Sequence, residues 1–110
     1  MSTQPTAIHP EARIGHVHLK VADLDRAIAF YHDVLGFELM QRYGRQAAFL
    51  SAGGYHHHIG ANSWQSAGAE KREAGRTGLN WIEMWSAHAN APESREDPWG
   101  TVIRTVPGHA

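Results

Sequence analysis

The sequence predicts an α+β domain in which one helix covers a sheet of four strands, in the chain order strand, helix, strand, strand, strand. An alternating stretch at residues 14–21 predicts the first strand. Apolar residues at helical spacing in residues 24–35 predict the helix, and apolar stretches between residues 37 and 62, separated by glycine-containing turns, predict three more strands. Because nothing else in this half of the chain can cover the apolar side of the sheet, we expect the helix to pack there.

The composition restricts the kinds of function. A chain of 110 residues forms one modest domain, so a large site would have to be completed by a partner chain. The 10 basic and 11 acidic residues give a net charge of −1, which argues against nucleic acid or an anionic membrane as a partner. With no apolar run of membrane-spanning length and no signal-peptide pattern, we expect a cytoplasmic protein. Since cysteine is absent, any metal must be held by nitrogen and oxygen ligands.

The first predicted strand has one apolar and one polar face. Its apolar face consists of Val17, Leu19 and Val21. Its polar face consists of His16, His18 and Lys20. The apolar face should meet the helix, for which Asp23 offers an N-terminal cap and Gly36 a C-terminal stop. The histidine face is then left open for a ligand or a partner.

The remaining strands of this half are expected at residues 37–42, 46–51 and 55–62. The last of these contains three consecutive histidines. Alternation along a strand that begins at Tyr55 places His56 and His58 on one face, and turns His57 with Ile59 toward the other.

Three segments follow from these patterns. Residues 1–12 are predicted to be a flexible N-terminal arm, and residues 13–64 form the module of one helix and four strands. In residues 65–110 the hydrophobic pattern is weaker, and we interpret them as a divergent remnant. A polar loop at 65–78 precedes one predicted strand at 79–85 and an extended tail.

The stretch GHVHLKVADLDRAIAFYHDVLGFEL, followed by AAFLSAGGYHHHIGANSW, resembles the vicinal oxygen chelate superfamily of glyoxalases, bleomycin resistance proteins and extradiol dioxygenases. It is most similar to proteins described as catechol-2,3-dioxygenase-like. The resemblance implies a βαβββ module, two of which stand side by side and form an open cup around a divalent metal. A single module implies a homodimer, in which a second copy restores the cup.

Carried over by position, the resemblance implies His16 and His58 as metal ligands. In relatives of this kind a second module carries another histidine, but Trp81 occupies that position here. Glu83 can be interpreted as a residue of that same strand, or as the carboxylate ligand that ends the second module after a deletion. Iron, manganese and zinc all suit such ligands, so the metal's identity stays open.

Two reactions are compatible with this resemblance. In extradiol cleavage of a catechol, His18 or His56 would serve as acid or base; in a glyoxalase-like reaction, Glu83 would move the proton. Ser51 occupies a position where ring-cleaving relatives often carry a histidine, which disfavours ring cleavage. The substrate pocket is expected to include Tyr55, Trp64 and Trp81. The alternatives are a metal-free protein that binds a small molecule or drug, and a degenerate module that only dimerises.

Overall fold

The computed structural model describes residues 7–71, 73, 75, 78–87 and 89–108. Its larger sheet has the order β1-β4-β3-β2. The strands are β1 (Val17–Lys20), β4 (Ile59–Asn62), β3 (Ala47–Ser51) and β2 (Glu38–Tyr43). β1 runs parallel to β4, and the other neighbours are antiparallel. The predicted α+β fold and its βαβββ order are therefore confirmed. Of the predicted N-terminal arm, residues 1–6 lie outside the described part, and residues 7–12 contain no helix or strand.

The helical segment begins and ends where the sequence predicted. α1 (Leu24–Ile28) is capped by Asp23, whose side-chain oxygen accepts a hydrogen bond of 3.1 Å from the backbone N–H of Arg26. It continues as a π-helical segment, η1 (Ala29–Val34). Gly36 then adopts a positive φ of 86°, which costs glycine little and turns the chain toward β2.

The helix covers one side of this sheet, as expected. Buried side chains from β1, the helix, β3 and β4 form one core: Leu19, Val21, Leu24, Ala27, Tyr31, Leu50 and Ile59. Removing each large aliphatic side chain from water contributes roughly 1.5–3 kcal/mol. The opposite face of β1 carries exposed His16 and His18, so the alternation predicted for this strand is correct.

A second sheet has the order β5-β7-β6. Its strands are β5 (Trp81–Ser86), β7 (Val102–Pro107) and β6 (Glu93–Glu96). The strand predicted at residues 79–85 corresponds to β5. The extended tail expected after it was wrong, because residues 93–96 and 102–107 are also strands. β7 is held between β5 and β6 by hydrogen bonds on both sides, and its Ile103 is buried in the core.

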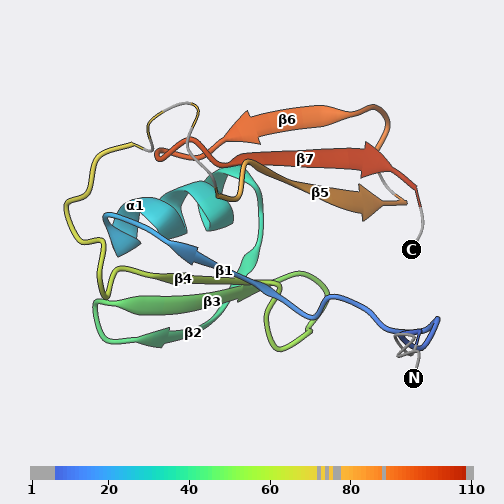
Figure 1. Cartoon of the computed structure of the whole chain (residues 1–110), viewed down its shortest axis with the longest axis horizontal. Coiled ribbons are helices and arrows are strands. Elements are labelled where there is room, and N and C mark those ends of the chain that lie inside the picture. The colour runs from blue at the N-terminus through green and yellow to red at the C-terminus, as the bar shows by residue number, and fades with distance from the viewer. Residues whose placement is uncertain (1–6, 72, 74, 76–77, 88, 109–110) are drawn as a thin grey trace, which may run out of the picture.

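The two sheets share one helix. Figure 1 shows α1 between the larger sheet and the sheet formed by β5, β6 and β7. Ile103 and Trp99 join the buried core, and Ile82 and Met84 pack against it. The hydroxyl of Tyr31 donates a 2.8 Å hydrogen bond to Asp97. Because Asp97 also accepts hydrogen bonds from the backbone N–H groups of residues 99 and 101, the helix is tied to the β6–β7 turn.

The second sheet repeats part of the first module's strand pattern. In both sheets an early strand runs parallel to a later one, which has an antiparallel neighbour on its other side. The described residues after β4 include no helix that could cover the second sheet. The apolar side of this sheet therefore packs on α1. The outer faces of the two sheets consequently point in opposite directions (Figure 1). No helix in the described residues is long and apolar enough to cross a membrane.

Candidate metal centre

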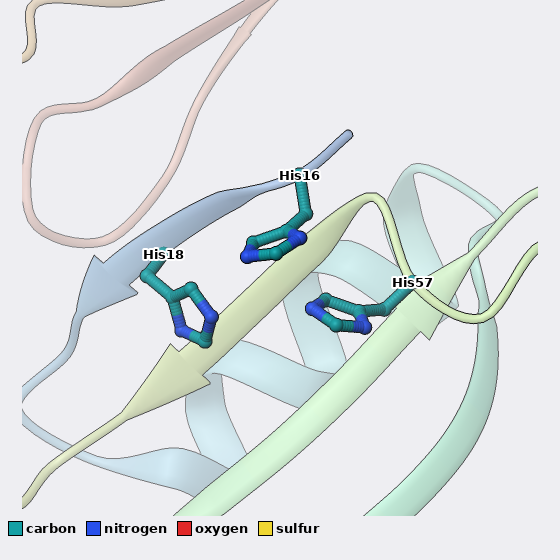
Figure 2. Close-up of side chains that lie close together, drawn as sticks. All are labelled: His16, His18 and His57. Atoms are coloured by element: carbon teal, nitrogen blue, oxygen red, sulfur yellow. The ribbon is translucent and has the colours of Figure 1, made fainter. Parts of the chain in front are cut away.

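Three histidines converge on the outer face of the larger sheet: His16, His18 and His57. One ring nitrogen from each lies within 4.8 Å of the others. The ring centroids are 4.9 Å apart for His16 and His18, and 4.3 Å apart for His16 and His57. Figure 2 shows His16 and His18 side by side along the first strand, with His57 facing them from the segment before β4. Such a group of nitrogen donors can hold a metal ion.

Residues 16 and 18 owe their positions to the strand. His18 belongs to β1 and His16 immediately precedes it, so both side chains leave the sheet on the side away from the helix. In the register of the parallel pair, His18 lies opposite Gly60 of β4. Because Gly60 has no side chain, the imidazole of His18 can rest against the sheet at this point.

His57 reaches the group because the fourth strand begins later than predicted. The expected strand at 55–62 starts only at Ile59, after a turn in which Gly53 and Gly54 have positive φ. Strict alternation therefore does not extend back to His57. The expectation that His57 turns toward the opposite face was wrong, and the structure places it beside His16. The glycine pair marks the turn before this strand, but it does not mark the residue at which the strand begins.

His58, which the resemblance implied as the fourth-strand ligand, has other partners. Its Nδ1 accepts a 3.2 Å hydrogen bond from the backbone N–H of Ala52 and lies 3.2 Å from the hydroxyl of Ser51. Its ring lies 4.7 Å from that of Tyr55. His58 is not in the group of converging nitrogens, so the structure does not bring the predicted His16 and His58 pair together as a metal site.

The chemistry of His57 suits a metal ligand. Its Nδ1 lies 2.9 Å from Nδ1 of His56, whereas its Nε2 is buried and has no hydrogen-bond partner among the described residues. Burial lowers the pKa of His57, and the neighbouring His16, His56, His18 and His58 lower it further. A lowered pKa favours the neutral imidazole, the form that offers a lone pair to a metal. The three histidines therefore fit a divalent ion.

An aromatic wall lies beside the three histidines. The ring of Phe49 is 4.7 Å from that of His57 and 6.2 Å from that of His18. The ring of Tyr43 lies 5.4 Å from Phe49 and extends the wall. This face is otherwise open. A cavity of about 420 Å³ lies elsewhere, between the end of the helix and the second sheet, and none of the three histidines lines it.

The other predicted site residues are more scattered. The ring of Tyr55 stacks on His56 at 4.0 Å, close to the three histidines. Trp64 is exposed beyond the other end of β4. Trp81 and Glu83 belong to β5 in the second sheet, where a carboxylate oxygen of Glu83 accepts a 2.9 Å hydrogen bond from the indole of Trp85. Within one chain, these β5 residues therefore lie on the far side of the helix from the histidines.

Comparisons with known proteins agree with this fold. Residues 13–104 match the Glyoxalase/Bleomycin resistance protein/Dioxygenase superfamily. A protein of Bacillus subtilis (strain 168) named catechol-2,3-dioxygenase is 45% identical over 84 residues, which are 76% of this chain. Those residues are 30% of the relative, so the chain corresponds to less than a third of its length.

Solved structures show the same architecture. Lactoylglutathione lyase from Agrobacterium tumefaciens aligns with a TM-score of 0.63 and 18% identity, over 90% of this chain and 96% of that protein. TnmS3, an antibiotic-binding protein from Streptomyces sp. CB03234, aligns with a TM-score of 0.55 and 15% identity, over 93% and 100% of the two chains. At these identities the likeness supports the fold alone.

Proposed function

Because this chain belongs to the Glyoxalase/Bleomycin resistance protein/Dioxygenase superfamily, we propose that it is a metal-dependent enzyme whose ion is held by His16, His18 and His57. The observation that carries this proposal is the buried Nε2 of His57, which has no hydrogen-bond partner in the described part of the chain and lies beside two further imidazoles. A buried nitrogen without a partner costs free energy, and a bound cation would supply the missing interaction. The metal is iron, manganese or zinc.

The substrate is a small molecule with two neighbouring oxygens. When bound, a divalent ion with open coordination positions supplies a Lewis acid that polarises and orients such oxygens. Three histidines on one side leave the exposed side for the substrate, and Phe49 and Tyr43 provide a surface for its planar part. The similarity to a catechol-2,3-dioxygenase favours a dioxygenase-like reaction on a catechol over a glyoxalase-like one.

The proposed ligand set changes the roles inferred from the sequence. His18, expected as an acid or base, becomes a ligand together with His16, and His57 replaces His58. His58 keeps one ring position free for chemistry, because its Nδ1 is an acceptor and its proton is therefore on Nε2. That N–H is the proton donor of the proposed site.

A second copy of the chain completes the site. Trp81 and Trp85 are 50% and 59% exposed on the outer face of the second sheet, with Glu83 between them. One chain cannot cover its own histidine face, because its two outer faces point away from each other. In a homodimer the β5 face of one copy covers the histidines of the other. Glu83 then adds a carboxylate to the site, and Trp81 adds an aromatic wall.

Metal analysis of protein purified without an affinity tag tests this function. We expect close to one iron, manganese or zinc ion per chain, lost in His16→Ala and in His57→Ala but kept in His32→Ala. His32 is the matched control because it is an exposed histidine whose Nδ1 pairs with Asp33. Dioxygen uptake with a catechol, and isomerisation of the adduct of a thiol and a 2-oxoaldehyde, distinguish the two reactions. Tight binding of an aromatic ligand by metal-free protein would instead support a binding protein and contradict the enzyme.

A further inference from the structure

We infer that His56 is a positioning residue, which holds His57 in the tautomer that turns a lone pair of Nε2 toward His16 and His18. The inference rests on the proposed metal site, but the hydrogen bond behind it belongs to the protein without metal. Nδ1 of His56 lies 2.9 Å from Nδ1 of His57, so one of these atoms donates and the other accepts.

Burial decides which of the two rings donates. If His56 were the donor, the neutral ring of His57 would carry its own proton on Nε2. There it would be a buried N–H with no acceptor among the residues that the structure describes. Among buried backbone groups, N–H groups without a partner are rarer than under-satisfied carbonyl oxygens, and we extend this order to the imidazole nitrogen. If His57 donates from Nδ1 instead, its Nε2 carries a lone pair. The second arrangement avoids the orphaned N–H and prepares a ligand atom.

The exposure of His56 also supports a hydrogen bond in which His57 donates and His56 accepts. When Nδ1 of His56 accepts, its proton is on Nε2, and because His56 is exposed this N–H can bind water. The ring is also held in place, because Tyr55 stacks on it with centroids 4.0 Å apart and planes at 36°. His56 is not one of the three converging histidines, so it acts through His57 rather than as a ligand.

Partners of this kind matter for metal sites in general. A histidine ligand usually donates its other ring N–H to a neighbouring acceptor, which fixes its tautomer and orientation. Loss of such a partner typically weakens metal binding by about 10–100-fold. Here the acceptor is a second imidazole, supplied by the adjacent residue in the chain.

The first experiment is imidazole ¹⁵N NMR of metal-free protein at neutral pH. We expect His57 to be protonated on Nδ1 and bare on Nε2. In His56→Leu the two tautomers of His57 should mix, and in His56→Asn, whose side-chain oxygen can accept in the position of Nδ1, the wild-type tautomer should return. A wild-type His57 protonated on Nε2 would overturn the inference.

The second experiment measures zinc affinity of the same proteins. His56→Leu should weaken binding by about 10–100-fold, and His56→Asn should stay close to wild type. His32→Leu, a change at a histidine outside the group, should have no effect. Wild-type affinity in His56→Leu would contradict the positioning role. Absence of zinc binding by wild-type protein would overturn the metal site itself, while the NMR result would still decide the hydrogen bond.

Discussion

Gly60 lies so close to the ring of His18 that a Cβ atom at residue 60 would stand 2.6 Å from both Cε1 and Nδ1 of the imidazole. Real Cβ atoms essentially never come this near another heavy atom. The absence of a side chain on β4 is therefore part of what places a proposed metal ligand on β1. A glycine in the middle of a strand otherwise weakens it, and the close approach of the His18 ring accounts for a glycine here.

Gly60→Ala should weaken zinc binding by at least about tenfold, as loss of a ligand's support does elsewhere. The methyl group forces the His18 ring away from His16 and His57. Titration of metal-free protein with zinc measures the effect. In a His18→Ala background, the same substitution at residue 60 should cause no further loss, because the ring that it displaces is gone. Equal losses in both backgrounds would show that Gly60 acts through something other than His18.

Tyr31→Phe should destabilise the fold. The phenol donates a buried hydrogen bond of 2.8 Å to Asp97, and hydrogen bonds to charged groups contribute about 1.5–3 kcal/mol. The free energy of unfolding, measured in urea, should fall by about that amount. Tyr43→Phe is the control because Tyr43 is exposed, and it should leave the unfolding free energy nearly unchanged. A loss in Tyr31→Phe no larger than in the control would contradict a stabilising role for this contact.

The same contact predicts a sensitivity to alkaline pH. Burial first, and then Asp97, raise the pKa of Tyr31 well above its usual value near 10. In the unfolded chain the phenol loses its proton as pH passes about 10, while in the folded protein it keeps it. Stability contributed by this group is thus fully present below about pH 10 and decreases as pH rises further. Urea unfolding at a series of pH values should show a steeper alkaline decline for wild type than for Tyr31→Phe.

The fold of residues 13–64 could be predicted because its signals are local. Alternation in residues 14–21 and the cap at Asp23 each depend on neighbouring residues alone. The second sheet could not be predicted in the same way. All four residues of β6 (Glu93–Glu96) are exposed, so this edge strand has no apolar face to reveal it. β7 buries Ile103 in a core that also contains residues of a helix far away in the sequence.

The site was predictable only in part for a related reason. The shared face of His16 and His18 follows from the alternation in residues 14–21, which is also present in the structure. The choice between His57 and His58 depends on where β4 begins, because a change of one residue in register reverses which side chains share a face. That start is set by a turn at Gly53 and Gly54 and by the backbone pairing of His58 with Leu50, which is a tertiary contact.

The last prediction concerns the partner that covers the histidines. If a second copy supplies its β5 face, Trp81→Ser combined with Trp85→Ser should convert a dimer into a monomer, because both indoles leave the contact. Light scattering during gel filtration measures this as a halved mass. Both side chains are on the outer face of the second sheet, so circular dichroism should remain that of a folded protein. Trp64→Ser is the matched control, because Trp64 is equally exposed, at 58%, but lies outside that sheet, and it should keep the dimer. A monomeric wild type, or a doubly substituted protein that stays dimeric, would contradict the proposal that the β5 face of a second copy covers the histidines.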